Sequence, residues 1–350
     1  DPDGAPTAPG ADVPFQYARW ATPTWSALEA ALGALEDADV AVVPSGMAAI
    51  AAVLLPLLHP GDRALLPADG YGPTRALAAE HLTPRGVHVD LVATQGLAHA
   101  DLSGYDLVLV ETPSNPGLRV ADLADVAARA HANGRRDGAG ALVVVDNTLL
   151  TPLGQRPLEL GADVVMASDT KAVNGHTDAL GGHVASRDPQ VMARVRGWRT
   201  LAGGILGTHE AWLIHRGLET LEVRFARMCA SAQAVAELAA GHPAVRAVVY
   251  PGLADHPDAE VVARQMTAAG GLVGLRFADA AAAERFIAAA QYVVPQTSFG
   301  GTHTAAERRA RWGDDVPDGF VRLSVGVEPT AELLADLERA MTAAGGGPTA

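Results

Sequence analysis

A single lysine is the residue of this chain most able to do covalent chemistry. Of the 26 lysines and arginines among 350 residues, Lys171 is the one lysine. Arginine can supply positive charge elsewhere, but only an amine can lose its proton and attack a carbonyl carbon. Lys171 stands among small and polar residues, in ASDTKAVNGHTDALGGH, and not on a charged helix face. Compositional bias could leave one lysine by chance, but this setting favours a chemical role.

Hydroxyl groups and a predicted helix start near Lys171 would suit a phosphate. Ser168 and Thr170 flank the end of a predicted strand, directly before the lysine. Residues 45–47 (SGM) open a predicted helix, where free N–H groups and the helix dipole favour an anion. An ordinary serine cap would explain the same three residues. A lysine with hydroxyl neighbours and a phosphate site is the combination that a pyridoxal phosphate Schiff base requires.

Three further polar residues could contact the ring of such a cofactor. Asp146 ends VVVD, the most apolar strand, where a carboxylate is costly unless it finds a partner. A protonated pyridine nitrogen would be one partner, and a turn or helix cap is the alternative. Tyr71, in a glycine-flanked loop, could stack on a flat ring or simply be an exposed turn residue. Asn115 is either a turn residue or an amide that reaches a phenolate oxygen.

Arg322 lies inside an apolar strand, FVRLSVGVE. A guanidinium in such a run usually has a carboxylate partner. The partner could be a substrate carboxylate held by two hydrogen bonds, or Glu328 in a structural ion pair, and the sequence favours neither.

Composition and missing motifs exclude several classes of protein. Hydrophobic residues make up 49% and charged residues 19%, which is enough for a packed core. The net charge of −14 disfavours nucleic acid as a partner. One cysteine, Cys229, permits neither an internal disulfide nor a cysteine-based zinc cluster, and the histidines lack metal-ligand spacing. No P-loop, G-x-S-x-G or G-x-G-x-x-G, signal-peptide pattern or membrane-length apolar run is present, so a cytoplasmic protein is expected.

The elements that must position these residues alternate between strand and helix. Predicted strands cover 40–44, 63–67, 87–93, 105–111, 141–146, 163–168 and 181–186. Predicted helices cover 24–35, 74–82 and 120–134, one begins at 45–46, and a long helical stretch runs from 209 to 238 with a break at Gly217. This alternation predicts an α/β fold with a mostly parallel sheet covered on both faces. We expect an arm at 1–22, a large domain at 23–215 and a smaller α/β domain at 216–350.

Eight ordered blocks resemble the pyridoxal-phosphate (PLP)-dependent enzymes of Cys/Met metabolism, the group of cystathionine γ-lyase, β-lyase and γ-synthase. The blocks are YARWATPT, PSGMAAI, DGYGPT, ETPSNP, VVVDNT, SDTKAVNGHTDALGGH, TSFGG and VRLSVGVE. The similarity runs from about residue 17 to residue 341. It implies the aspartate-aminotransferase-like fold (fold type I), pyridoxal 5'-phosphate as cofactor, and a homotetramer built from dimers.

The resemblance also implies residue roles. Lys171, as the Schiff-base lysine, and Tyr71 would be catalytic, and no metal site is implied. Arg322, supported by Ser298, would bind the substrate carboxylate. Tyr17 and Arg19 would reach a neighbouring subunit's phosphate. The implied cofactor-binding residues are Lys171, Asp146, Tyr71, Gly46, Met47, Ser168, Thr170, Asn115, Tyr17 and Arg19.

The function that follows from this resemblance is carbon–sulfur lyase chemistry on a small amino acid. We expect γ-elimination from cystathionine or a related thioether, giving cysteine, 2-oxobutyrate and ammonia. A γ-replacement transferase would share every motif, and a cystathionine β-lyase is a further alternative. A non-catalytic PLP-binding protein is the alternative from another class, and it would need neither Lys171 nor Arg322. No membrane partner is expected.

Overall fold

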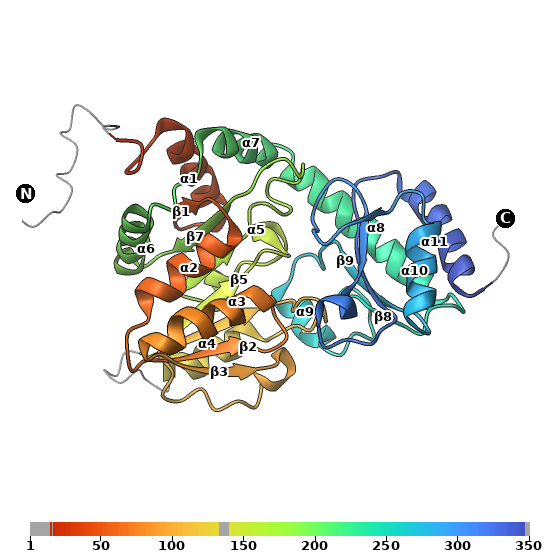
Figure 1. The fold of residues 1–350 in the computed structure, drawn as a ribbon, viewed down its shortest axis with the longest axis horizontal. Helices are drawn as coiled ribbons and strands as arrows, with labels where there is room; N and C mark the ends of the chain where they lie inside the picture. Colours follow the sequence, from red (N-terminus) through yellow and green to blue (C-terminus); the bar gives the residue numbers. More distant parts are fainter. Residues whose placement is uncertain (1–14, 16, 133–139, 347–350) are drawn as a thin grey trace, which may run out of the picture.

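The chain folds around two β-sheets, each with its own helices (Figure 1). The computed structural model describes residues 15, 17–132 and 140–346. Most of the predicted arm, and the predicted helix end at Gly134, therefore lie outside the described residues. Within the described ranges, no helix combines the length and hydrophobicity that a membrane crossing requires.

The larger sheet has seven strands in the order β1-β7-β6-β5-β4-β2-β3. Its strand β7 is antiparallel to both neighbours, β1 and β6, and all other pairings are parallel. This arrangement confirms the predicted mostly parallel α/β sheet. The strands are β1 (Asp39–Val43), β2 (Arg63–Pro67), β3 (His88–Val92), β4 (Leu107–Glu111), β5 (Leu142–Asp146), β6 (Val164–Ala167) and β7 (Gly182–Ser186).

Helices cover both faces of this sheet because its central strands are apolar on both sides. In β5, Val144 packs into the core beneath α2 and α6, whereas Val143 and Val145 pack toward α4. Successive side chains of a strand point to opposite faces, so an uninterrupted valine run requires cover on both. The helices are α1 (Pro23–Glu36), α2 (Gly46–Leu57), α3 (Gly72–Leu77), α4 (Leu123–Ala132), α5 (Thr151–Gly154), α6 (Pro189–Ala202) and α7 (Thr208–Leu218).

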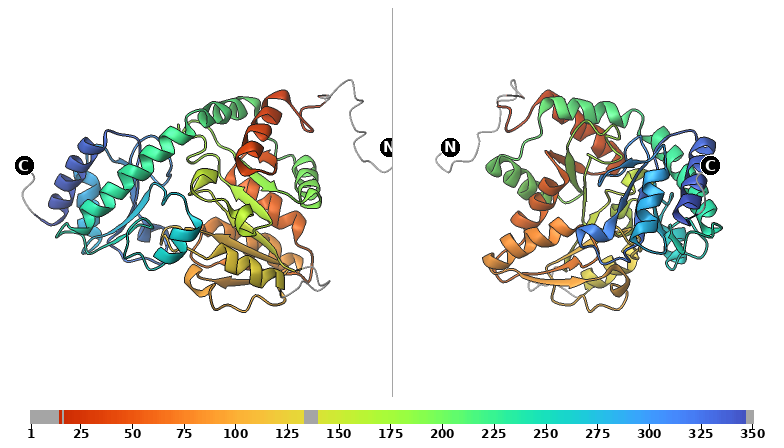
Figure 2. Two further views of the ribbon diagram at one scale, coloured as in Figure 1. Left: turned by 180° about the vertical axis from the view of Figure 1, so that it is seen from behind. Right: turned by 45° about the vertical axis from the view of Figure 1, so that its right-hand side comes forward.

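The second sheet has five strands in the order β10-β11-β12-β9-β8. The long helix α8 leads from α7 toward this sheet and packs on it with α10 and α11 around a separate apolar core (Figure 2). The elements are α8 (Leu221–Ala240), β8 (Ala247–Val249), α9 (Ala259–Gln265), β9 (Leu272–Arg276), α10 (Ala280–Ala289), β10 (Val294–Pro295), β11 (Ala305–Arg308), β12 (Phe320–Ser324) and α11 (Thr330–Ala344).

Most predicted elements lie within a few residues of the observed ones. The predicted helix 74–82 is α3 followed by a π-helical turn, Ala78–Leu82, and the helix α6 was not predicted. Four short 3₁₀ turns complete the list: Thr83–Arg85, Thr94–Gly96, Pro157–Leu160 and Arg309–Trp312. The domain limit proposed before Arg216 falls inside α7, and that division stays a prediction.

A buried histidine joins α1, β7 and the segment that carries Lys171. Nδ1 of His183 lies 2.7 Å from Asp169 Oδ1, and Nε2 lies 3.3 Å from Glu36 Oε1. Burial alone would lower the pKa of His183, but the two carboxylates outweigh it and raise the pKa from 6.5 to about 10. The imidazole is therefore charged at neutral pH.

Replacing this histidine is expected to destabilise the fold. His183→Leu leaves Asp169 buried without its cation, which costs about 3–5 kcal/mol of unfolding free energy. Because the pKa is raised on folding, the stabilisation is full below pH 6.5 and is lost as pH rises toward 10. Urea unfolding should therefore show a difference in unfolding free energy between wild type and variant, and this difference should shrink as the pH rises from 6.5 to 10. A difference that does not change with pH would contradict a charged His183. His88→Leu, at an exposed position, is the control.

Candidate active site

A pocket of about 610 Å³ opens where the carboxyl ends of the large sheet's strands face the second sheet. Loops that follow β1, β2, β4, β5 and β6 line it on one side, and residues 297–322 line it on the other. Open α/β sheets bind ligands at this edge. Nine of the predicted site residues line the pocket: Gly46, Met47, Tyr71, Asn115, Asp146, Ser168, Thr170, Lys171 and Arg322.

Lys171 lies in the turn after β6, and its amine contacts the second sheet's loop. Nζ donates a hydrogen bond of 2.9 Å to Ser298 Oγ and lies 4.8 Å from the ring centre of Phe299. Burial, and then the charge of Arg322, lower its pKa from 10.5 to about 8. The amine can therefore lose its proton near neutral pH, as a nucleophile or base must.

Two carboxylates end neighbouring strands at the pocket floor. Glu111 ends β4, Asp146 ends β5, and the two are register partners. Burial raises the pKa of Asp146, although hydrogen bonds from Thr148 oppose the shift. Burial, and then the charge of Asp146, raise the pKa of Glu111 well above its usual range. The sequence prediction included Asp146 but missed Glu111, which the same reasoning about a carboxylate at the end of an apolar strand could have found.

The phosphate-binding residues predicted from the sequence meet at the start of α2. Ser45 caps this helix by accepting a hydrogen bond of 3.1 Å from the Ala48 amide. A Cβ added at Gly46 would lie 2.6 Å from Ser168 Cβ, so the two segments approach too closely for any other residue. Thr170 Oγ1 donates to the Gly181 carbonyl and accepts from the Gly181 amide, which fixes this hydroxyl beside the lysine.

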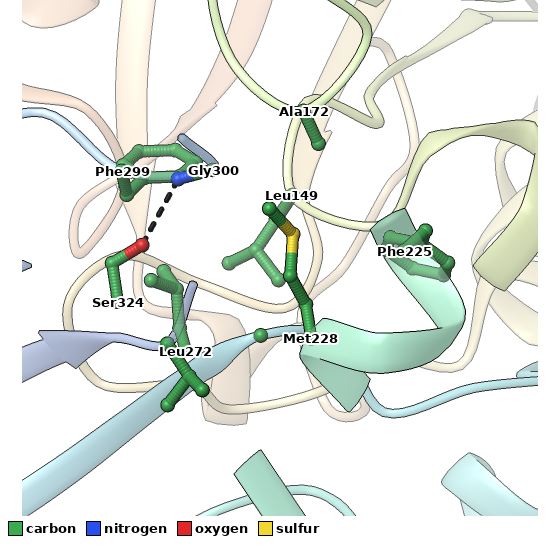
Figure 3. Close-up of a pocket in the computed structure, with 10 residues that line it drawn as sticks. Leu149, Ala172, Phe225, Met228, Leu272, Phe299, Gly300 and Ser324 are labelled. Atoms are coloured by element: carbon green, nitrogen blue, oxygen red, sulfur yellow. Dashed lines mark hydrogen bonds between the residues drawn. The ribbon is translucent and has the colours of Figure 1, made fainter. Parts of the chain in front are cut away.

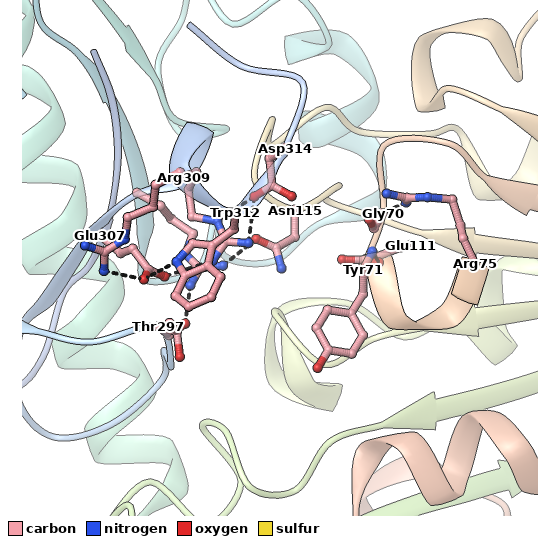
Figure 4. A network of polar contacts seen from close by, with 12 residues as sticks. Gly70, Tyr71, Arg75, Glu111, Asn115, Thr297, Glu307, Arg309, Trp312 and Asp314 are labelled. Carbon is pink, nitrogen blue, oxygen red and sulfur yellow. Dashed lines mark hydrogen bonds and ion pairs between the residues drawn. The ribbon is translucent and has the colours of Figure 1, made fainter. Parts of the chain in front are cut away.

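The loop that carries Tyr71 is held by Glu111 and Arg75. The Tyr71 amide donates a 2.6 Å hydrogen bond to Glu111 Oε2. Arg75 Nη1 donates to the Gly70 carbonyl at 2.7 Å. The side chain of Tyr71 is 42% exposed, and Figure 4 shows it across the pocket from Asn115 and Trp312. An aromatic side chain at such a site is available to stack on a flat ligand.

Arg322 projects from β12 into the pocket and has no protein carboxylate as its hydrogen-bond partner among the described residues. Nη1 donates to Asn115 Oδ1 at 2.7 Å, and Nη2 donates to the Thr297 carbonyl. Glu328 instead accepts from the amide and hydroxyl of Thr304. The alternative of an Arg322–Glu328 ion pair is therefore wrong. Burial lowers the pKa of Arg322 to about 10, so a ligand carboxylate would meet a poorly solvated cation.

Tyr17 and Arg19 do not line the pocket of their own chain. Tyr17 is 51% exposed, and Arg19 Nη1 donates to the Thr200 carbonyl at the end of α6. Their predicted role toward a neighbouring subunit stays a prediction.

Behind Phe299 lies a small apolar void of about 10 Å³ (Figure 3). Phe225, Met228 and Leu272 line it, and Ser324 Oγ accepts a hydrogen bond from the Gly300 amide at its edge. The void is too small for a substrate, so its lining only supports the loop that carries Ser298 and Phe299.

The pocket fits pyridoxal phosphate on its own geometry. It offers a half-buried amine of lowered pKa, a half-buried carboxylate for the pyridine nitrogen, and an exposed aromatic side chain for the ring. The start of α2, with the close approach of Gly46 to Ser168, suits the phosphate. These features are the ones that a PLP lysine requires.

Comparison with known proteins agrees with a pyridoxal phosphate site. Residues 3–342 match the family model described as Cys/Met metabolism PLP-dependent enzyme. A Streptomyces coelicolor protein provisionally named cystathionine gamma-lyase is 47% identical over 94% of this chain and 84% of the relative. A cystathionine gamma-synthase of Mycobacterium tuberculosis is 40% identical over 93% of this chain and 86% of its own length.

Among solved structures, CalE6 in its apo form, a methionine gamma lyase from Micromonospora echinospora, superposes with a TM-score of 0.86 at 40% identity. The match covers 93% of this chain and 87% of that one. The predicted fold type I architecture and cofactor are thus confirmed. The chain belongs to the PLP-dependent enzymes of Cys/Met metabolism, and it is an enzyme of carbon–sulfur bond chemistry that uses pyridoxal phosphate.

Proposed function

We propose that this enzyme is a carbon–sulfur lyase that cleaves cystathionine, or a related thioether amino acid, by γ-elimination. The products are cysteine, 2-oxobutyrate and ammonia. The observation that carries the proposal is the half-buried Lys171 amine, with a lowered pKa, in one pocket with Arg322. The similarity to a relative named cystathionine gamma-lyase supports this substrate class.

Pyridoxal phosphate, when bound, supplies an electron sink for carbanions at the substrate's α and β carbons. Asp146 would hold the pyridine nitrogen protonated, while Thr148 donates to its carboxylate at 2.5 and 3.0 Å. The residues that would hold the phosphate are Gly46, Met47, Ser168 and Thr170. Asn115 would lie near the ring oxygen.

Lys171 would move the protons of the reaction. Because its pKa is about 8, its neutral amine is accessible near pH 7 and can take the proton from the substrate's α carbon. Ser298 Oγ, 2.9 Å from Nζ, orients this amine. The Tyr71 hydroxyl, facing the pocket, would give a proton to the departing thiolate.

Arg322 would bind the substrate α-carboxylate. Asn115 and the Thr297 carbonyl fix its guanidinium, so little side-chain freedom is lost on binding. Ser298 follows Thr297 directly, which links the carboxylate site to the lysine.

We also propose a homotetramer built from dimers. Tyr17 and Arg19 would complete the phosphate site of a neighbouring subunit, because neither lines the pocket of its own chain. Sedimentation equilibrium of the holoenzyme tests this state, and a monomer would contradict it.

The second candidate is a γ-replacement transferase, because a relative named cystathionine gamma-synthase matches over 93% of the chain. We predict that the holoenzyme releases 2-oxobutyrate from cystathionine faster than it forms cystathionine from an acyl-homoserine and cysteine. Keto-acid assays with 2-oxobutyrate and pyruvate standards measure the cleavage, and chromatographic quantification of cystathionine measures the synthesis. Pyruvate as the main product would indicate β-cleavage instead, and the reverse order of rates would favour the transferase.

The proposed role of Lys171 in holding the cofactor can be tested without a substrate. Wild-type protein should show the visible-edge absorbance band of bound cofactor, and Lys171→Ala should lack it. Because only the neutral amine attacks an aldehyde, apoenzyme should capture pyridoxal phosphate at a rate that rises with pH to a midpoint near 8. A rate that is independent of pH between 6.5 and 9 would argue against Lys171 as the capturing group.

Arg322→Met should weaken substrate binding while sparing the cofactor. Loss of a charge-assisted contact predicts a KM increase of about 10- to 100-fold for cystathionine. The cofactor absorbance band should persist. Arg276→Met, an exposed arginine on the neighbouring strand β9, is the control. An unchanged KM would assign Arg322 to a structural role.

A further inference from the structure

A second cluster of charges lines the pocket and is left unused by the proposed chemistry. After β11, the 3₁₀ turn Arg309–Trp312 places Arg309 and Trp312 at the pocket wall, and Asp314 follows. Figure 4 shows all three on the side opposite Tyr71. Arg309 is close enough to Arg322 for its charge to contribute to lowering the Arg322 pKa.

One buried carboxylate organises this turn. Glu307, only 1% exposed, accepts hydrogen bonds from Arg309 Nη1 at 2.9 Å and Trp312 Nε1 at 2.6 Å. Arg311 Nη2 also donates to it, at 2.8 Å. Glu307 is the register partner of Arg322 on β12, so the turn is tied directly to the strand that would hold the substrate. A site fixed in this way is pre-organised before any ligand arrives.

Arg309 and Asp314 present opposite charges side by side. Arg309 Nε lies 2.7 Å and Nη2 lies 2.6 Å from Asp314 Oδ2. In the part of the chain that the structure describes, Arg309 contacts Glu307 and Asp314 through three of its five N–H groups, which leaves N–H groups for a ligand carboxylate. Asp314 lines the pocket, and no hydrogen bond to its Oδ1 is found among the described residues, so this oxygen could accept from an ammonium group. Trp312, 61% exposed, offers an apolar surface beside the pair.

We propose that Arg309, Asp314 and Trp312 form a subsite for the distal end of a thioether substrate, selecting an S-substituent that itself carries an amino and a carboxylate group. The proposal rests on the proposed function of the pocket and names its substrate class more narrowly. Arg309 binds the distal carboxylate, Asp314 binds the distal ammonium, and the Trp312 ring packs on the methylene groups near the sulfur. A thioether with an alkyl substituent gains none of the charged contacts.

The test compares cystathionine with S-propyl-homocysteine, which keeps the thioether but lacks the distal charges. In the holoenzyme, Arg309→Met and Asp314→Asn should each raise KM for cystathionine about 10- to 100-fold. Both should leave kcat/KM for S-propyl-homocysteine within about threefold and the cofactor absorbance intact. Arg309→Lys should recover part of the loss. Arg311→Met is the matched control, because Arg311 shares Glu307 but does not line the pocket.

Two measurements separate failure of the subsite from failure of the proposed function. If cystathionine is not cleaved, calorimetric titration of the holoenzyme still gives its affinity, and if it is cleaved, the KM of the keto-acid assay takes that place. If cystathionine binds through Arg309 but yields no 2-oxobutyrate, the proposed subsite is supported and the proposed γ-elimination is wrong. If cystathionine is cleaved with wild-type KM by Arg309→Met, the subsite is wrong. Equal losses with both thioethers, or with Arg311→Met, would overturn it too, because they would show that the turn only supports the fold.

Discussion

The active site depends on keeping one amine in a place that disfavours its charge. Partial burial of Lys171, and then the charge of Arg322, lower the pKa of its amine toward neutrality. An exposed lysine would stay protonated near pH 7 and could neither attack an aldehyde nor accept a carbon-bound proton. The surrounding architecture maintains this environment. Ser298, in the loop between β10 and β11 of the second sheet, accepts a hydrogen bond from this amine, so residues of both sheets' loops set its position.

The strand ends of the large sheet supply two carboxylates to the pocket. Thr148 Oγ1 donates to Asp146 and accepts from the Ser168 amide, so one hydroxyl joins the Asp146 carboxylate to the segment that carries the lysine. Glu111, on the next strand, holds the Tyr71 loop rather than contacting this hydroxyl. Two neighbouring carboxylates thus have different tasks because their hydrogen-bond partners differ.

Local patterns were sufficient to predict most strands, and they predicted Asp146 and Lys171 because strand ends and a solitary lysine are visible in the sequence. They were insufficient wherever a contact joins distant segments. Glu36 and His183 are 147 residues apart, and no periodicity indicates that they meet. Glu328 likewise pairs with Thr304, 24 residues away, and not with Arg322, and no local pattern indicates that contact. Arg309 opens a short turn and Asp314 follows it, and the sequence does not specify the direction of that turn.

Different parts of the pocket serve proton transfer and substrate selection, and the reason is physical. Proton transfer needs atoms held within hydrogen-bond distance of one another, and strand ends with buried partners such as Asp146 provide that rigidity. Recognition of a substrate's far end tolerates more variation, and here it falls to the 3₁₀ turn after β11. Glu307 holds this turn through hydrogen bonds from Arg309 and Trp312, while Arg309 and Asp314 line the pocket. A change in Arg309 or Asp314 can therefore alter the accepted thioether without disturbing Lys171, which a change in β5 or β6 could not do.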